Sequence, residues 1–286
     1  MSVAKGALYS KHTHISSRHK LTDLKLDEVW QYRELIGLFT RRSFKVAYKQ
    51  TILGPMWLFI NPLMTSAMHL LVFGNIARLG TDGIPQLLFY LSGNAIWGFF
   101  AACLNGNAST FTGNAGLFGK VYFPRLTIPI SNVLSSAIRF LIQMILVAGL
   151  LIFYYVTGTM TPHLLRLLLV PVILAWLGIM AMGCGIILSS LTVKYRDLSV
   201  LVGFGMSLWM YGTPVVYPLS TLSGTLRSII TLNPVTMPVE LFRWAVLGTG
   251  SLSAVSAACS LVFTAAVFFA GVILFNRVER NFMDVV

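Results

Sequence analysis

Charged residues, and acidic ones above all, are scarce in this sequence. Only 10% of its 286 residues are charged and nine are Asp or Glu, whereas 56% are hydrophobic. A soluble domain carries about a quarter charged residues because its surface faces water. This scarcity excludes a soluble globule and indicates that lipid covers most of the outer surface.

Residues for catalysis and metal binding are scarce as well. None of the nine carboxylates lies in a long apolar run, where a membrane hydrolase or an ion-coupled carrier needs titratable groups. Cys103, Cys184 and Cys259 are far apart in apolar stretches, which excludes a disulfide framework and a zinc motif. We therefore expect no catalytic residue, metal or cofactor in this chain, and energy supplied from elsewhere.

The segment from Gly113 to Lys120 comes nearest to a nucleotide-binding loop. A P-loop needs Gly, four residues, Gly-Lys and then Ser or Thr, so that amides hold phosphate and the hydroxyl binds magnesium. Here the first glycine stands one position too early relative to Gly119, and Val121 occupies the hydroxyl position. The sequence predicts that the chain does not bind ATP by itself.

Six apolar runs dominate the chain. Each is about 19 residues or longer, enough to cross ~30 Å of hydrocarbon at ~1.5 Å per helical residue. They cover residues 56–74, 85–111, 130–156, 164–191, 198–216 and 252–275. The predicted fold is an all-α membrane protein with six transmembrane helices, in a domain over residues 51–275.

The basic residues predict the orientation of these helices. With the N-terminus inside, sixteen Lys and Arg lie on the cytoplasmic side and four on the other, as the positive-inside rule requires. Ten precede Thr51 and most others stand singly between apolar runs, so the net charge of +12 does not indicate a nucleic-acid surface. Both termini are predicted to be cytoplasmic.

The two terminal regions are polar. Residues 1–26 form a basic tail whose histidines lack carboxylate or cysteine partners for a metal, and residues 276–286 form a short charged tail. Residues 27–50 predict an amphipathic helix, with Asp27 as its capping residue and Arg41 and Arg42 among its cations. Such a helix lies in the membrane interface with its cations at anionic headgroups.

A polar, glycine-rich segment, residues 112–129, separates the second run from the third. Aromatic and apolar residues mix there with Lys120 and Arg125. Such an element is either a loop on the bilayer or a docking helix for a cytoplasmic partner. The pattern alone does not separate the two.

One face of the third run carries a polar stripe, formed by Asn132, Ser136, Arg139 and Gln143. An arginine near the middle of a span costs ~2.5–3.5 kcal/mol unless it finds a partner or water. We therefore expect Arg139 to face other helices or a hydrated cavity. Interhelical hydrogen bonding explains the stripe at least as well as a place in a transport path does.

Four prolines punctuate the stretch from Pro214 to Gly250, which begins at the end of the fifth run. Its two apolar pieces, about 219–232 and 235–247, are each too short to span the membrane. They predict two half-helices that dip back into the outer leaflet. Glu240 and Arg243 stand three positions apart there and can pair. The alternative is an ordinary outer loop on the surface.

Aromatic side chains gather near the predicted membrane boundaries, among them Trp209, Tyr211 and Tyr217. An interfacial belt is the default explanation for such residues. A lining that stacks on sugar rings is the functional alternative, and composition does not separate the two.

Several motifs together resemble one known family. The segment Phe44–Trp57, with Asn-Pro beyond it, resembles the entry to the first span of ABC-2-type polysaccharide exporter permeases. The segment Leu232–Arg243 resembles the outer hairpin of the same permeases, and the turn at 195–197 and the closing residues 279–284 match in kind. The resemblance covers nearly the whole chain after residue 27.

This resemblance implies a division of labour between chains. Two copies of the permease pair around a central path and bind two copies of a separate ATPase, which holds the ATP and magnesium. The segment at about 114–126 becomes a coupling helix resting on that ATPase, and the hairpin at about 218–248 becomes an outer gate. The cargo becomes a lipid-linked polysaccharide such as O antigen, capsule or teichoic acid, exported across the bacterial inner membrane.

The resemblance also implies residues for three roles. The substrate path takes Phe59, Asn61, Trp97, Arg139, Trp209, Tyr211 and Tyr217. Docking on the partner ATPase takes Arg41, Arg42, Leu117, Lys120, Tyr122, Phe123 and Arg125. The outer gate takes Asn233, Pro234, Glu240 and Arg243.

Two other functions stay open at this point. An ABC-2 exporter of lipid or drug would share the predicted fold. A membrane-embedded enzyme acting on lipid-linked sugar needs acid or base residues around a cavity, and the scarcity of carboxylates in the apolar runs disfavours it.

Overall fold

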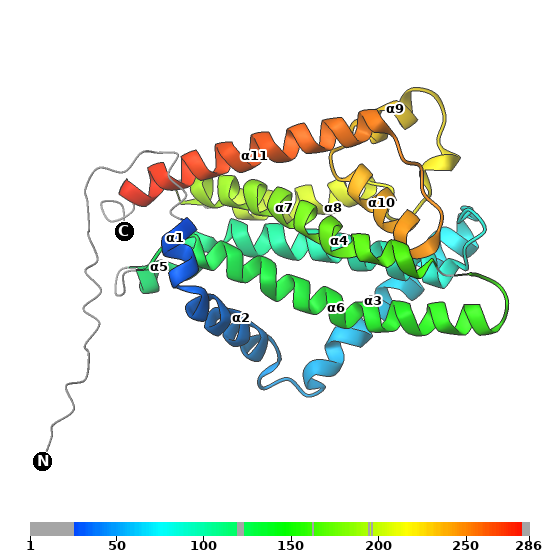
Figure 1. Cartoon of the computed structure of the whole chain (residues 1–286), viewed down its shortest axis with the longest axis horizontal. Helices are drawn as coiled ribbons and strands as arrows, with labels where there is room; N and C mark the ends of the chain where they lie inside the picture. The colour runs from blue at the N-terminus through cyan, green and yellow to red at the C-terminus, as the bar shows by residue number, and fades with distance from the viewer. Residues whose placement is uncertain (1–25, 119–122, 162, 194, 196, 282–286) are drawn as a thin grey trace, which may run out of the picture.

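A computed structural model describes residues 26–118, 123–161, 163–193, 195 and 197–281 (Figure 1). Over these residues the chain consists of helices, turns and connecting loops, with no strand. The predicted all-α fold class is confirmed. The long helices lie side by side along the length of the molecule in Figure 1.

Within the part of the chain that the structure describes, five helical segments are long and apolar enough to cross a membrane. The first is Gly54–Ile76, which joins the 3-10 turn η1 (Gly54–Met56), α3 (Trp57–His69) and the π-helix η2 (Leu70–Ile76). The next two are α4 (Gln86–Ala108) and α6 (Thr127–Val156). The last two are η3 with α7 (Leu164–Leu169 and Val170–Thr192) and α11 (Ala254–Asn281).

The predicted run 198–216 contains a shorter apolar helix. Helix α8 (Leu198–Tyr211) has 14 residues, about 21 Å at ~1.5 Å per residue, which is less than the hydrocarbon thickness of ~30 Å. The helix ends there because Gly212 and Pro214 follow, and a proline has no N–H to continue it. Residues 212–217 continue as turns and bends.

Short helices lie at the two ends of the bundle. Helices α1 (Leu26–Gln31) and α5 (Thr110–Phe118) lie at one end in Figure 1, and α2 (Arg33–Tyr48) runs from there along α6. At the opposite end lie the turn η4 (Leu219–Thr221) and the helices α9 (Gly224–Leu232) and α10 (Thr236–Leu247). We call these the α5 end and the α10 end.

Helix α4 forms the centre of the bundle, where it packs against α6 and α7. Its side chains are buried on nearly all sides, as Leu88, Ile96 and Phe100 show. The other long segments bury one face and expose large apolar residues on the other, such as Ile145 of α6 and Val262 of α11. Exposed apolar faces of this extent are those that lipid covers in a membrane protein.

Glycines bring α7 close to two neighbours. A Cβ atom at Gly185 would lie 2.5 Å from Asn107 Cβ and 2.8 Å from the Leu104 carbonyl oxygen, both on α4. A Cβ atom at Gly183 would lie 2.9 Å from the Val267 carbonyl oxygen on α11. Small residues of this kind allow helices within membranes to pack backbone against backbone.

Candidate functional site

A buried ion pair lies at the α10 end. Glu240 and Arg243 stand one turn apart on α10, with Glu240 Oε1 3.2 Å from Arg243 Nη1. Their side chains are only 3% and 2% exposed, so each charge depends on the other for the interactions that water would supply. The pair expected from their spacing is therefore present, and it is buried.

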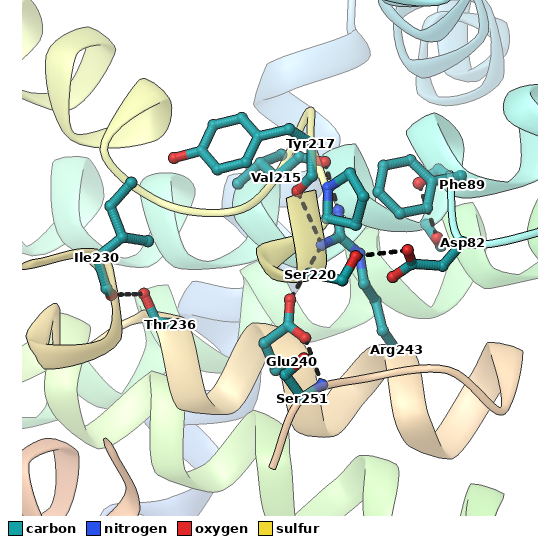
Figure 2. A network of polar contacts seen from close by, with 12 residues as sticks. Asp82, Phe89, Val215, Tyr217, Ser220, Ile230, Thr236, Glu240, Arg243 and Ser251 are labelled. Carbon is teal, nitrogen blue, oxygen red and sulfur yellow. Dashed lines mark hydrogen bonds and ion pairs between the residues drawn. The ribbon is translucent and has the colours of Figure 1, made fainter. Parts of the chain in front are cut away.

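Arg243 anchors the chain that follows α8 (Figure 2). Its Nη2 donates a hydrogen bond to the Val215 carbonyl oxygen at 2.6 Å, and its Nη1 donates to the Tyr217 carbonyl oxygen at 3.4 Å. The guanidinium also lies 4.0 Å from the ring centroid of Phe89 on α4, at cation–π distance. Gly93 makes room for this arrangement, because a Cβ atom there would lie 2.6 Å from the Val215 oxygen.

Glu240 joins α10 to the loop that leads to α11. Its Oε2 accepts a hydrogen bond from the Ser251 N–H at 2.7 Å. Burial raises the pKa of the Glu240 carboxyl, and the charge of Arg243 opposes that rise. Figure 2 places a further contact beside the pair, in which Ser220 Oγ donates to Asp82 Oδ1 at 2.5 Å. The ion pair and its neighbours thus hold together four separate segments of the chain.

Asn233 joins α8 to the short helices of the α10 end. Its Oδ1 accepts hydrogen bonds from Trp209 Nε1 at 3.0 Å and from the Val235 N–H at 3.1 Å. Its Nδ2 donates to the Gly212 carbonyl oxygen at 2.7 Å and to Thr213 Oγ1 at 2.9 Å. One side chain therefore uses both its acceptor and its donor group to fix the C-terminal end of α8 against the α9–α10 turn.

Proline and glycine set the ends of α9 and α10. Helix α9 ends before Asn233 because Pro234 disfavours helical backbone in the residue it follows, and Asn233 has φ −61° and ψ 124°. Pro238 lies in the first turn of α10, where backbone N–H groups have no helical partner to lose. Gly248 ends α10 in the left-handed conformation, with φ 79°.

Aromatic residues form a cluster at the α5 end. It comprises Phe111 and Phe118 of α5, Phe123, Ile128 of α6, Ile186 of α7 and Phe275 of α11, all of them buried. The ring centroids of Phe111 and Phe275 lie 4.8 Å apart, and those of Phe118 and Phe123 lie 5.7 Å apart. This aromatic cluster joins α5 and the turn at 123–126 to three of the long helices.

The docking residues predicted on α2 are exposed. Arg41 and Arg42 lie on the same face of α2 as Lys45, and the opposite face packs against the bundle. Phe39 marks that packed face, since its ring centroid lies 5.7 Å from that of Phe123. The helix therefore presents a basic surface outward and an aromatic one inward.

The remaining predicted docking residues have different surroundings. Phe123 is buried in the aromatic cluster and Leu117 packs against it, so both support the segment from within. Arg125 is partly exposed and lies 5.3 Å from the centroid of a ring in the cluster. Lys120 and Tyr122 lie outside the residues that the structure describes. Helix α5 ends at Phe118 and is kinked at Asn114.

The structure brings together four of the predicted path residues in two pairs. Trp97 and Trp209 both pack against Phe100, at centroid distances of 5.5 and 5.3 Å. The Tyr217 hydroxyl donates to the Tyr211 carbonyl oxygen at 2.9 Å. All four residues therefore gather around α8 and the chain that follows it.

The other three path residues lie on α3 and α6. Asn61 is exposed and Phe59 is half-buried on α3, and Arg139 is partly buried on α6. Within the described residues, the Arg139 Nε atom is buried without a hydrogen-bond partner. Asn132 of the same stripe donates to the Gly106 carbonyl oxygen of α4 at 2.9 Å, so one member of the stripe serves interhelical bonding.

Among the described residues, no three His, Cys, Asp or Glu side chains lie together as ligands for a metal ion. The only ionised residues that we find buried as a pair there are Glu240 and Arg243, and they are engaged with each other. This arrangement holds backbone segments in place, since Arg243 bonds to the carbonyl groups of Val215 and Tyr217 and Glu240 accepts from the Ser251 N–H.

Comparison with known proteins agrees with the resemblance carried by the motifs. A family model described as "ABC-2 type transporter" matches residues 34–247. The chain is 30% identical over 255 residues to the O-antigen export system permease protein RfbA of Klebsiella pneumoniae, which covers 88% of this chain and 95% of that protein. It is 30% identical over 209 residues to the protein of the same name from Myxococcus xanthus, covering 72% and 78%. It is 22% identical over 241 residues to the polysialic acid transport protein KpsM of Escherichia coli, covering 84% and 91%. The chain therefore belongs to the ABC-2 type transporter family.

Proposed function

We propose that this chain is the membrane subunit of an ATP-driven exporter that moves a lipid-linked polysaccharide across the bacterial inner membrane. The observation that carries the proposal is the match to an O-antigen export permease over 88% of this chain and 95% of the relative. A second relative is named for polysialic acid transport. The relatives thus carry different polysaccharide names, which supports the class of cargo and leaves the individual sugar open.

In this proposal the energy comes from a partner. Two copies of the chain pair around a central path and bind two copies of an ATP-binding-cassette ATPase, which holds the ATP and magnesium. The sequence supports this arrangement, because its nearest approach to a P-loop lacks both the glycine spacing and the hydroxyl residue that phosphate and magnesium require.

The α5 end faces the cytoplasm in this arrangement, and both termini lie on that side. The positive-inside rule supports this orientation, because α2 presents Arg41, Arg42 and Lys45 there on its exposed face. These cations and Arg125 then form the surface that meets the ATPase. The α10 end, with the gate residues Asn233, Pro234, Glu240 and Arg243, faces the periplasm.

The aromatic cluster could transmit movement from the ATPase into the membrane-spanning helices. A push on α5 displaces Phe111 and Phe118, and close-packed side chains pass a displacement on rather than absorb it. The cluster therefore conveys movement to α6, α7 and α11. At the other end, α8 and the α9–α10 turn move as one unit because Asn233 bonds to both.

The path itself would be lined by residues of α3, α6 and the C-terminal end of α8. Tyr211 and the exposed Asn61 offer a sugar an aromatic face and an amide, and the partly buried Arg139 adds a positive charge on α6. Trp97 and Trp209 would add further aromatic surface to the path, and both pack against Phe100. Aromatic faces stack on the CH faces of sugars while amides bond to their hydroxyls, which suits a polysaccharide cargo.

A charge-reversal experiment tests the proposed docking surface. The complete chain is co-expressed with its partner ATPase, and the complex is purified through a tag on the ATPase. We expect the double substitution Arg41→Glu with Arg42→Glu to abolish co-purification while the chain still inserts into membranes. Arg227→Glu, a reversal at an exposed position on α9, is the matched control and should leave the complex intact.

Two results would refute the proposal. One is a chain that never associates with the ATPase, and the other is a complex whose ATP hydrolysis is indifferent to lipid-linked polysaccharide. If ATP hydrolysis by the complex responds instead to a drug or to a simple lipid, the chain is an exporter of that drug or lipid.

A further inference from the structure

An apolar crevice lies between α8 and the neighbouring helices of the bundle. Its volume is about 570 Å³, with α8 on one side and α4, α7 and α11 on the other. Leu104, Leu188, Val202, Met206 and Phe263 are among the residues that line it. The polar side-chain groups of the lining are the Cys184 thiol and the Trp209 indole N–H, and the latter is already bonded to Asn233.

Neither empty space nor water suits this crevice. Protein interiors are close-packed, and side chains that face a void lose their contacts on that side. Water requires two to four polar partners, and the lining supplies almost none. The crevice therefore calls for an apolar occupant.

The occupant can reach the crevice from the side. Leu201 lines it and is also 57% exposed, so the crevice is continuous with the outer apolar surface of α8. In a membrane that surface is covered by lipid hydrocarbon.

We propose that one acyl chain of a membrane phospholipid occupies this crevice and holds α8 away from α7 and α11. Phospholipid acyl chains are the hydrocarbon that surrounds the exposed faces of α8 and α11, and they are flexible enough to follow the wall between them. Hydrogen bonds of Asn233 fix the Tyr211 end of α8, and the acyl chain sets the spacing of the helix below that point. The proposal depends on the membrane location of the chain and is independent of the cargo.

Two glycines of α8 provide a matched test. A Cβ atom at Gly205 meets no other atom within 4 Å, and Gly205 lines the crevice. Leucine at that position therefore enters the crevice without a clash and competes with the acyl chain. Gly203 is equally open but does not line the crevice, and leucine raises helix propensity to the same extent at both positions.

Tryptophan quenching reads out the occupant. The complete chain is reconstituted into vesicles of a phospholipid whose acyl chains are brominated, and bromine quenches indole fluorescence on contact. The contribution of Trp209 is obtained by comparison with the Trp209→Phe variant. We expect the Trp209 contribution to be quenched in the unmodified chain and in Gly203→Leu, and to lose most of that quenching in Gly205→Leu. Equal quenching in Gly203→Leu and Gly205→Leu, or none in the unmodified chain, would overturn the proposal.

Mass spectrometry of the chain released gently from the membrane gives an independent check. We expect one retained phospholipid per chain, present in Gly203→Leu and lost in Gly205→Leu. A retained polyprenyl lipid in its place, or no retained lipid with α8 cross-linked to a second copy through Gly205→Cys, would overturn the assignment to phospholipid.

Discussion

Trp209 and Asn233 are joined by a 3.0 Å hydrogen bond from the indole N–H to the side-chain oxygen, across 24 positions of sequence. The same asparagine donates to Gly212 and Thr213 at the end of α8. These bonds make the end of α8 and the α9–α10 turn a single mechanical unit, which matters because the proposed outer gate must follow a helix of the proposed path.

Asn233→Asp distinguishes the hydrogen bonds that Asn233 accepts from those that it donates. The carboxylate still accepts from Trp209 and Val235 but no longer donates to Gly212 and Thr213, so the exposed Gly212 carbonyl oxygen and the partly buried Thr213 hydroxyl lose a partner. We expect the free energy of unfolding of the detergent-solubilised chain to fall by about 1–3 kcal/mol. We also expect the transport rate to fall by more than this loss of stability explains. Asn233→Ala should cost at least as much, and a fully active Asn233→Ala chain would contradict the proposed coupling.

Removing one member of the buried pair at the α10 end should be strongly destabilising. Arg243→Met leaves Glu240 buried without an opposite charge and releases the Val215 and Tyr217 carbonyl groups, so we expect a loss of about 3–5 kcal/mol in unfolding measurements. The exposed Arg227→Met on α9 is the control and should change stability by less than about 0.5 kcal/mol. A double-mutant cycle with Glu240→Gln should show coupling, and strictly additive losses would show that the pair is not a unit.

Gly185 should tolerate no side chain. A methyl group there would lie 2.5 Å from Asn107 Cβ and 2.8 Å from a backbone oxygen of α4, so Gly185→Ala forces α7 away from α4. We expect a cost of about 1–3 kcal/mol from the overpacking. Gly98→Ala on α4 is the comparison, since a Cβ atom there meets nothing within 4 Å, and the gain in helix propensity should leave that variant as stable as the unmodified chain or slightly more so. Equal melting temperatures for both variants would mean that α4 and α7 pack less closely than described.

The aromatic cluster should couple the α5 end to the long helices. Phe275→Ala removes the ring that lies 4.8 Å from Phe111, and an aromatic truncation in a packed core costs about 3–5 kcal/mol. We expect the complex with the ATPase to assemble still, because the exposed cations of α2 are untouched, while ATP hydrolysis loses its response to the polysaccharide. Phe269→Ala, at a position of α11 that is 62% exposed, should keep the response. An intact response in Phe275→Ala would remove the cluster from the mechanism.

Much of the architecture could be predicted from the sequence because the bilayer imposes simple rules. Long apolar runs must become helices in hydrocarbon, and five of the six predicted runs are long helical segments whose ends differ from the prediction by a few residues. The run at 198–216 was harder, because apolar composition continues past the point where Gly212 and Pro214 end the helix at Tyr211. Hydropathy alone does not predict that the helix ends at Tyr211.

The site was only partly predictable, for a physical reason. The spacing of Glu240 and Arg243 indicated that they pair, yet no pattern indicated that Arg243 would bind the carbonyl groups of Val215 and Tyr217, since every residue carries a carbonyl. The cluster of Phe111 with Phe275 was also missed, because two ordinary phenylalanines far apart in sequence give no local signal. Phe123 shows the converse, since a residue predicted to meet a partner is instead buried at 4% exposure.

Transport by a reconstituted complex tests the central claim most directly. The complete chain and the ATPase are placed together in vesicles with a labelled lipid-linked polysaccharide on the side of the ATPase, and the label that crosses to the other side is measured with and without ATP. The proposed function predicts ATP-dependent crossing that is lost when either subunit is omitted. Crossing that is absent with an active ATPase, or that proceeds equally well without this chain, would contradict it.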